Sequence, residues 1–376
     1  MISLKKHLLI IIFIASITLS FSNTIILAYP NISAQAAILV EAETGEVLYK
    51  KNSHQKRPPA STTKIMTGIL AIELGDLDDK VVASSNAANE GGSSIYLETG
   101  EKLTLEEMVY GLLLKSGNDA AVAIAEYIAN SVEDFADLMN QKALEVGALN
   151  TTFKNPNGLP QEGHLTTAYD LAQIARYSLE DKTFAQIVAT PEKRISWPGN
   201  DWDRILKNTN RLLNLSDTID GVKTGYTRRA GKCLVASETR DGQRLISVVL
   251  KSNNPWGETE KLLDYGFENF NRYKLVEKGE LLHKFNFNEK HKLGIKAAKE
   301  FNFVSSDVDR INVKREVNLN KDLSLPISKG QKIGNLSFYK NDKLLGKVDL
   351  IADREIPNSS FVKLINDLIS AIQIYF

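Results

Sequence analysis

The sequence predicts a mixed α/β domain, followed by a small all-β domain and a C-terminal amphipathic helix. Short apolar runs typical of strands lie near both ends of residues 29–272, with helical periodicity between them. Residues 273–356 instead alternate short apolar runs with turns, a pattern typical of a small β-sandwich or barrel. The final segment, 359–376, gathers its apolar residues on one helical face.

Composition excludes several classes of protein. The 376 residues carry 46 basic and 46 acidic side chains, and this zero net charge argues against a nucleic-acid partner. Cys233 is the single cysteine, so neither an internal disulfide nor a cysteine zinc site can form. The five histidines show no metal-ligand spacing, and no metal or other cofactor is expected.

The first 28 residues have the order of a secretory signal peptide. Lys5 and Lys6 precede an apolar run at 8–21, and polar residues then lead to a predicted cleavage site after Ala28. The alternative is an uncleaved membrane anchor over the same stretch. Both interpretations place the rest of the chain outside the cytoplasm.

Two short strands and a helix are predicted next. The strands lie within 36–50 and are joined by a turn at Gly45. Pro58 and Pro59 favour an extended loop. The helix that follows ends at Gly75, and it has apolar residues at helical spacing. These residues are Ile65, Met66, Ile69, Leu70 and Leu74.

The middle of the chain is predicted to be helical. One helix begins at Thr104, because Glu107 three residues later completes a capping box, and it ends near Lys115. Residues 116–118 separate it from a helix that ends at Ile128. Two more helices are predicted at 134–146 and 167–179.

Strands return in the last part of the first domain. Buried strands are predicted at 233–236 and 245–250, with a turn at Asp241-Gly242 between them. A helix at about 258–270 closes the domain. We expect the early and late strands to share one sheet.

Ser61 and Lys64 are the first candidates for catalysis. They lie three residues apart at the start of a predicted helix and therefore share a face. A serine hydroxyl needs a base to become a good nucleophile, and a lysine can serve if burial or a nearby cation lowers its pKa. The same spacing occurs at Ser53 and Lys56, but the two prolines that follow exclude a helix interior there.

Two further motifs carry reactive side chains. Ser116 and Asn118 flank a glycine at a helix junction, where a hydroxyl and an amide could pass a proton and bind a carbonyl. Lys223 and Thr224 precede Gly225, and this combination can bind a carboxylate close to the backbone. Taken alone, the first motif is equally consistent with a helix cap and the second with an ordinary turn.

In this order, the three motifs resemble those of the penicillin-recognising serine enzymes, whose fold is β-lactamase-like. Longer stretches resemble the low-molecular-mass penicillin-binding proteins of the serine-type D-alanyl-D-alanine carboxypeptidase family. They are PASTTKIMT at 59–67, LKSGNDAA at 114–121 and DGVKTGYT at 220–227. The resemblance is strong over 30–270, and the β-rich part and terminal helix resemble the family's stalk and anchor.

The resemblance implies a role for each motif residue that reacts. Ser61 would be the acylated nucleophile, and Lys64 would accept its proton. Ser116 would relay a proton toward the leaving D-alanine. No metal or cofactor is implied.

The remaining motif residues are implied to bind the substrate. Asn118 would hold the substrate amide, and Lys223 would support the network around the loop serine. Thr224 would lie near the terminal carboxylate, and Gly225 would let the substrate approach the backbone. The backbone N–H of Tyr226 and that of the nucleophile would form the oxyanion hole.

The implied activity is removal of the terminal D-alanine from peptidoglycan pentapeptide stems, with β-lactams as covalent inhibitors. A DD-endopeptidase would use the same machinery. A class A-like β-lactamase would need a deacylating glutamate, but residues 155–159 fill the expected place, and Glu162 lacks the following asparagine. A catalytically inactive wall-binding protein is disfavoured by the intact motifs.

Two other residues, His164 and Cys233, each allow two interpretations. His164 lies in a loop that either lines the cleft or presents a plain surface histidine. Cys233 is expected to be a buried strand residue, in preference to a reactive thiol.

The predicted terminal helix is too short to span a bilayer, which needs about 20 apolar residues. It suits a helix lying flat on the outer face of the cytoplasmic membrane, with Lys363 and Asp367 nearly cancelling in charge. The alternative is a helix docked on its own β-domain. In either case, the apolar face of the helix would consist of Leu364, Tyr375, Leu368, Phe361, Ile372, Ile365, Phe376, Ile369 and Val362.

Overall fold

In the computed structural model, residues 29–286, 292–306, 313–320, 323 and 326–356 are described. The predicted signal peptide at 1–28 and the predicted amphipathic helix at 359–376 lie outside the described residues. Within the described part, no helix is long and apolar enough to cross a membrane.

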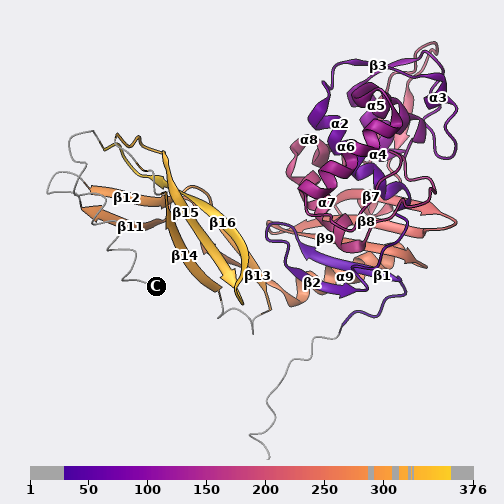
Figure 1. The fold of residues 1–376 in the computed structure, drawn as a ribbon. Coiled ribbons are helices and arrows are strands. Elements are labelled where there is room, and N and C mark those ends of the chain that lie inside the picture. Colours follow the sequence, from indigo (N-terminus) through magenta and orange to yellow (C-terminus); the bar gives the residue numbers. More distant parts are fainter. Residues whose placement is uncertain (1–28, 287–291, 307–312, 321–322, 324–325, 357–376) are drawn as a thin grey trace, which may run out of the picture. The chain divides into compact units, whose positions relative to one another are not determined.

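A five-stranded antiparallel sheet organises the first domain (Figure 1). Its strand order is β2-β1-β9-β8-β7, so the early strands pair with the late ones, and the prediction that they share a sheet is confirmed. In chain order the strands are β1 (Ala36–Glu41), β2 (Val47–Lys51), β7 (Ile219–Thr227), β8 (Gly231–Arg240) and β9 (Gln243–Ser252).

Helices cover both faces of this sheet. Helix α7 (Ala168–Glu180) packs on β1 and β9, whereas α9 (Pro255–Asn269) packs on β8 and β9. Figure 1 shows the two helices on opposite sides of the strands. Because both faces are covered, β1 is buried throughout, which explains its continuous apolar sequence.

The remaining helices form a bundle beside α7, and the helices predicted from periodicity are confirmed. Helix α2 lies at its centre, with every residue from Lys64 to Ala71 buried. The predicted capping box at Thr104 is also present. The helices of this bundle are α2 (Lys64–Leu74), α4 (Leu105–Leu114), α5 (Asn118–Ala129), α6 (Val132–Glu145) and α8 (Lys182–Val188).

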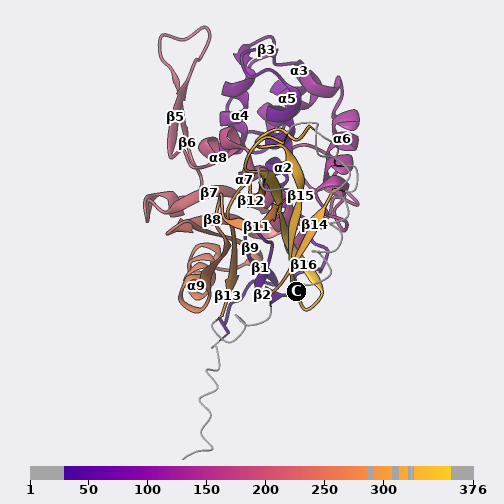
Figure 2. The same cartoon turned by 90° about the vertical axis from the view of Figure 1, so that its left-hand side faces the viewer.

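Several short elements were not predicted. Strands β3 (Lys80–Val82) and β4 (Lys102–Thr104) pair with each other near α3 (Ser85–Ala88). Strands β5 (Glu192–Ile195) and β6 (Arg204–Lys207) form a hairpin that packs on α4, and its loop extends beside the bundle in Figure 2. With three or four residues each, of which at least one is charged, these strands are too short to show a clear apolar alternation.

The β-rich region confirms the predicted small all-β domain. A five-stranded sheet has the order β11-β12-β16-β15-β14, and a two-stranded sheet joins β10 to β13. Phe301 of β13 stacks on Phe338 of β15 with ring centroids 4.8 Å apart, so the two sheets share a core. The strands are β10 (Asn271–Val276), β11 (Leu281–Asn286), β12 (Lys292–Ala297), β13 (Phe301–Ser305), β14 (Val313–Leu319), β15 (Lys332–Lys340) and β16 (Lys343–Ala352).

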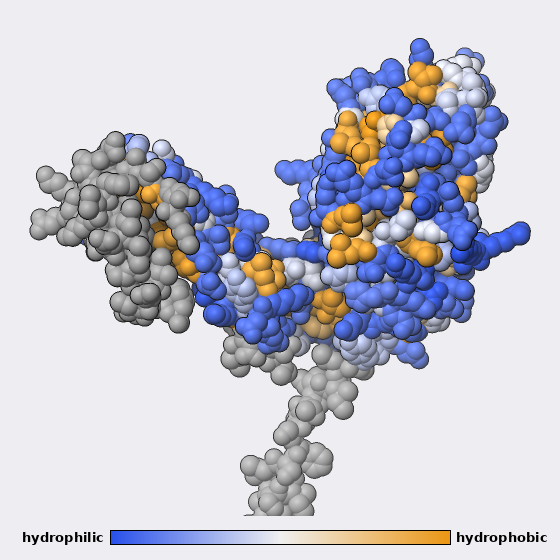
Figure 3. Space-filling model, in the orientation of Figure 1, coloured by the Kyte–Doolittle hydropathy of each residue, from blue (hydrophilic) through white to orange (hydrophobic). Residues whose placement is uncertain are grey.

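The described surface seen in Figure 3 is mostly hydrophilic, with apolar residues in small separate patches. Patches of this kind are ordinary on a protein surface that faces water. Among the large side chains that stay exposed, Tyr96 and Trp202 both lie in loops.

Candidate active site

Ser61 lies in a 3-10 turn, Ala60–Thr63, which leads directly into α2. The sequence predicted Ser61 at the start of this helix, and the structure places it in the turn that opens α2. Gly158 fixes this turn from outside, because a side chain there would collide with the carbonyl of Ala60. Its φ of +87° also favours glycine.

Lys64, the first residue of α2, forms hydrogen bonds with three separate segments of the chain. Its Nζ donates hydrogen bonds to Ser61 Oγ at 3.2 Å, to Asn118 Oδ1 at 2.7 Å and to the Asn157 carbonyl at 2.6 Å. Burial, and secondarily the charge of Lys223, lower the pKa of Lys64 well below its usual value. The three acceptors suit the ammonium form, whereas burial favours the neutral amine, so this lysine can give up a proton more easily than an exposed one.

Ser116 and Asn118 lie where α4 gives way to α5, as the sequence predicted. Ser116 has a positive φ of 67°, and its buried Oγ has no hydrogen-bond partner in the described part of the chain. Asn118 Nδ2 donates to the Gly91 carbonyl at 2.5 Å, and its oxygen accepts from Lys64. An unpaired buried hydroxyl costs free energy, which a bound substrate could recover.

Strand β7, which contains the third motif, lies against the turn that contains Ser61. A side-chain carbon on Gly225 would lie 3.1 Å from the backbone nitrogen of Ser61, so strand and turn are in direct contact. Thr224 Oγ1 lies 2.8 Å from Thr209 Oγ1. Lys223 is buried and donates to the carbonyl of Thr224 at 3.2 Å, and burial lowers its pKa to about 7. A direct hydrogen bond from Lys223 to the loop serine, which the predicted network suggested, is not seen among the described contacts.

The three motifs surround one cleft of about 690 Å³. Five of the eight predicted site residues line it, and the other three are buried immediately behind it. The five are Ser61, Ser116, Thr224, Gly225 and Tyr226, and the three are Lys64, Asn118 and Lys223.

Other residues that line the cleft were missed. Asn208, Thr209 and Arg211 follow the short strand β6, and Lys232 and Trp256 come from the far side. Their sequence context carries no motif, and contacts with other segments hold the first three at the cleft, such as the hydrogen bond from the Thr209 N–H to the Leu114 carbonyl. The charged residues in this lining are all basic, which suits an anionic substrate.

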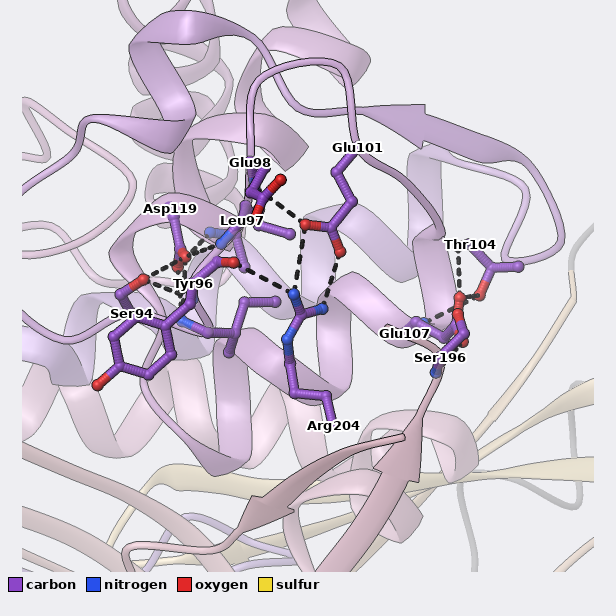
Figure 4. A network of polar contacts seen from close by, with 12 residues as sticks. Ser94, Tyr96, Leu97, Glu98, Glu101, Thr104, Glu107, Asp119, Ser196 and Arg204 are labelled. Carbon is purple, nitrogen blue, oxygen red and sulfur yellow. Dashed lines mark hydrogen bonds and ion pairs between the residues drawn. The ribbon is translucent and has the colours of Figure 1, made fainter. Parts of the chain in front are cut away.

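A buried carboxylate holds the wall of the cleft in place. Asp119 accepts backbone N–H groups from Ile95 and Leu97, each at about 3.1 Å or less, and the Ser94 hydroxyl at 2.5 Å (Figure 4). In the same loop, the Ser93 carbonyl accepts a hydrogen bond from the backbone N–H of Asn118 at 2.7 Å. Asp119 thereby ties the loop to the start of α5.

We expect Asp119→Ala to destabilise the fold. The substitution leaves buried N–H groups without acceptors, which should lower the free energy of unfolding by roughly 2–4 kcal/mol. Urea denaturation would measure the loss. The control is Asp134→Ala, since Asp134 is an exposed carboxylate near a helix N-terminus and its removal should cost far less. Equal costs for the two variants would contradict this account.

His164 and Cys233 are both buried. Neither interpretation of His164 is right, because its Nδ1 accepts the Lys154 N–H at 3.0 Å and its Nε2 lies 2.9 Å from Thr63 Oγ1. Burial lowers its pKa to about 4, so this imidazole is a neutral support behind the catalytic turn. The prediction for Cys233 as a buried strand residue is confirmed, and burial raises its thiol pKa to about 11.

The fold and cleft are those of a penicillin-binding serine enzyme with an additional β-domain. Residues 23–254 match the family model described as D-alanyl-D-alanine carboxypeptidase (peptidase S11). Residues 270–358 match that of the penicillin-binding protein 5 C-terminal domain. The chain therefore belongs to the D-alanyl-D-alanine carboxypeptidase family.

Individual relatives agree with this assignment. D-alanyl-D-alanine carboxypeptidase DacF of Bacillus subtilis is 38% identical, over 88% of this chain and 87% of that protein. DacD of Escherichia coli is 31% identical over 90% of both chains. Among solved structures, penicillin binding protein 5 from Haemophilus influenzae has a TM-score of 0.69 at 28% identity, covering 87% of this chain and 98% of that one. PBP3 from Streptococcus pneumoniae has a TM-score of 0.76 at 27% identity, covering 87% of this chain and all of the other.

Proposed function

We propose that this serine-type D-Ala-D-Ala carboxypeptidase removes the terminal D-alanine from peptidoglycan pentapeptide stems through an acyl-enzyme on Ser61. The family supplies the activity, and one observation carries the assignment of the nucleophile. Ser61 Oγ lies on the cleft, hydrogen-bonded to a buried lysine whose pKa is lowered. A nucleophile held by its own base is the arrangement that covalent catalysis needs.

The acylation step follows from this geometry. As Ser61 Oγ attacks the carbonyl of the penultimate D-alanine, its proton passes to Lys64. The backbone N–H groups of Ser61 and Tyr226 stabilise the oxyanion. The proton then passes from Lys64 through the Ser116 hydroxyl, which takes up one proton as it gives up another, to the leaving amine, and the C–N bond breaks. Water hydrolyses the ester in the second half of the reaction and regenerates the hydroxyl.

Substrate binding uses the groups that remain free on the cleft. One N–H of the Asn118 amide is donated to Gly91, which leaves the second for a substrate carbonyl. We assign the terminal carboxylate to the hydroxyls of Thr209 and Thr224, with Arg211 supplying positive charge. Gly225 lets the peptide approach β7 without a side chain between them.

We expect Lys223→Ala to shift the pH dependence of penicillin acylation toward alkaline pH. The Lys223 charge is one of the causes that lower the pKa of Lys64. Removing it favours the ammonium form of Lys64, so the neutral base appears only at higher pH. Acylation rates measured from pH 5 to 10 would show the shift. If the acidic limb of the pH profile stays in place and only the maximal acylation rate falls, Lys223 does not lower the pKa of Lys64.

The β-lactamase alternative makes a different prediction for the acyl-enzyme. The segment at 155–159 contacts the catalytic turn through the Asn157 carbonyl and Gly158, and the charged residues in the cleft lining are all basic. Deacylation of penicillin should therefore be slow, with release taking many minutes or longer. Rapid steady-state hydrolysis would instead support a β-lactamase. The DD-endopeptidase alternative shares the machinery and needs a cross-linked substrate to test.

We also propose the placement of the enzyme in the cell. Residues 1–28 act as the signal peptide, 29–272 as the catalytic domain, 273–356 as the β-rich stalk and 359–376 as a helix on the outer face of the cytoplasmic membrane. The support is the order of basic, apolar and polar residues at the start and the apolar face at the end.

Truncation before Ser359 is expected to give a fully active enzyme that no longer sediments with membranes. The full-length chain should sediment and resist a high-salt wash, because apolar burial outweighs the attraction between Lys363 and lipid. Release by salt alone, or unfolding of the β-domain on truncation, would contradict the anchor.

A further inference from the structure

The β5–β6 hairpin packs on α4 and ends in a loop that extends beside the helical bundle (Figure 2). Its tip, residues 196–203, carries Trp197 and Trp202, and the Trp202 side chain is 64% exposed. Together with Asn200, Asp201 and other tip residues, they line a hollow of about 500 Å³. An exposed indole beside amide and carboxylate groups offers a flat apolar surface next to hydrogen-bonding groups.

The end of the hairpin next to the tip loop is fixed to the catalytic domain (Figure 4). Arg204 forms a buried ion pair with Glu101 at 2.9 Å and donates to the Tyr96 carbonyl at 3.2 Å. Directly after the other strand, β5, the Ser196 hydroxyl donates a hydrogen bond to the Glu107 carboxylate at 2.6 Å. Trp197 packs over the guanidinium of Arg204 at 4.7 Å. Trp197 therefore stabilises the hairpin, whereas Trp202 is free to bind.

The hairpin is continuous with the catalytic cleft. Asn208 and Thr209 follow β6 directly and line the cleft, and Thr209 contacts Thr224 of β7. Asp203 and Thr209 lie six positions apart, so an extended strand carries the tip about 20 Å from the cleft.

The proposed substrate has a similar span. Four stem residues precede the scissile bond and cover about 14 Å when extended. The lactyl link to the sugar and the side-chain linkage at position two lengthen this further. A stem peptide seated in the cleft would thus bring its sugar to the distance of the hairpin tip.

We propose that the hairpin tip binds the glycan strand of peptidoglycan, with Trp202 stacked on a sugar ring. This inference rests on the proposed function. The C–H face of a pyranose is apolar and fits a flat indole, while hydroxyl and N-acetyl groups at its rim can hydrogen-bond to Asn200, Asp201 and Asp203. The two carboxylates disfavour an anionic lipid surface, which would otherwise suit an exposed tryptophan.

The test compares Trp202→Ala with the full wild-type chain on three probes. These are a soluble pentapeptide ending in D-Ala-D-Ala, isolated sacculi, and glycan strands from which an amidase has removed the stem peptides. We expect unchanged D-alanine release from the pentapeptide, several-fold slower release from sacculi, and about tenfold weaker binding of the bare strands, measured by isothermal titration calorimetry. Trp202→Phe, which keeps an aromatic ring, should retain part of this affinity.

Leu149→Ala is the matched control, because Leu149 is 69% exposed and lies outside both the hairpin and the cleft lining. It should behave as wild type on all three probes. Unchanged binding of bare strands by Trp202→Ala would overturn the proposal, as would an equal loss on pentapeptide and sacculi. Loss of binding to phosphatidylglycerol vesicles with intact glycan binding would identify a membrane contact instead. A wild-type chain that released no D-alanine from the pentapeptide would refute the proposed function, and the strand titration would still test the hairpin.

Discussion

Ser61→Ala is expected to abolish covalent labelling by a fluorescent penicillin. Opening of the β-lactam ring requires a nucleophile that is deprotonated within the cleft, and Ser61 is hydrogen-bonded to the buried amine of Lys64. The Ser93 and Ser116 hydroxyls also reach the cleft, but neither has a hydrogen bond to a lysine among the described contacts. Fluorescence in a denaturing gel would measure the label, since only a covalent adduct survives denaturation.

The controls separate lost chemistry from lost folding. The Ser61 hydroxyl is partly exposed, so its removal should change the free energy of unfolding by less than about 1 kcal/mol. Ser93→Ala should keep the label, because Ser93 only lines the cleft. A Ser61→Ala protein that still carries penicillin would show that another residue is the nucleophile.

Lys64→Ala should have the second largest effect. Without the amine, the serine proton has no acceptor, and the rate of penicillin acylation should fall by about 10²–10⁴-fold. Penicillin should still bind reversibly, because the cleft-lining residues are unchanged. Stopped-flow measurement of acylation, with saturating penicillin, separates the two effects.

A second variant at position 64 controls for structural changes that a cavity at this site would cause. Lys64 is fully buried, so alanine leaves a cavity beside the Asn157 carbonyl and the Asn118 amide. Lys64→Met keeps most of the volume and removes only the amine. Both variants should lose acylation alike. Acylation at the wild-type rate in Lys64→Met would remove this residue from the role of base.

The parts of the fold and site that the sequence predicts are those set by local patterns. The Ser61 and Lys64 pair depends on a spacing of three residues at a helix start, and the capping box at Thr104 depends on the same spacing. Apolar runs as long as those of β8 and β9 identify a buried strand without knowledge of its partner.

What the sequence leaves undetermined depends on contacts between distant segments. The Asn157 carbonyl reaches Lys64 across 93 positions, and Arg204 reaches Glu101 across 103. A backbone carbonyl carries no residue-type signal. The burial of His164 behind Thr63 is equally invisible, because a histidine in a polar loop has the sequence of a surface residue.

Positions in the cleft lining show the same limit. Thr209 and Arg211 follow a strand of four residues whose charges obscure its pattern, and Thr209 is held at the cleft by hydrogen bonds to Leu114 and Thr224 of other segments. Ser61 lies in a 3-10 turn at the predicted helix start, and the packing of Gly158 against the preceding carbonyl carries no sequence signal. Motif spacing thus identifies reacting groups, and tertiary packing decides their exact setting.

The most direct test of the central claim is the product formed from a pentapeptide stem ending in D-Ala-D-Ala. Purified full-length chain should release one equivalent of free D-alanine and leave the tetrapeptide, and Ser61→Ala should release none. Free D-alanine is scored enzymatically and the tetrapeptide by mass spectrometry. Absence of D-alanine, together with cleavage of a cross-linked dimer, would contradict the carboxypeptidase and establish the endopeptidase.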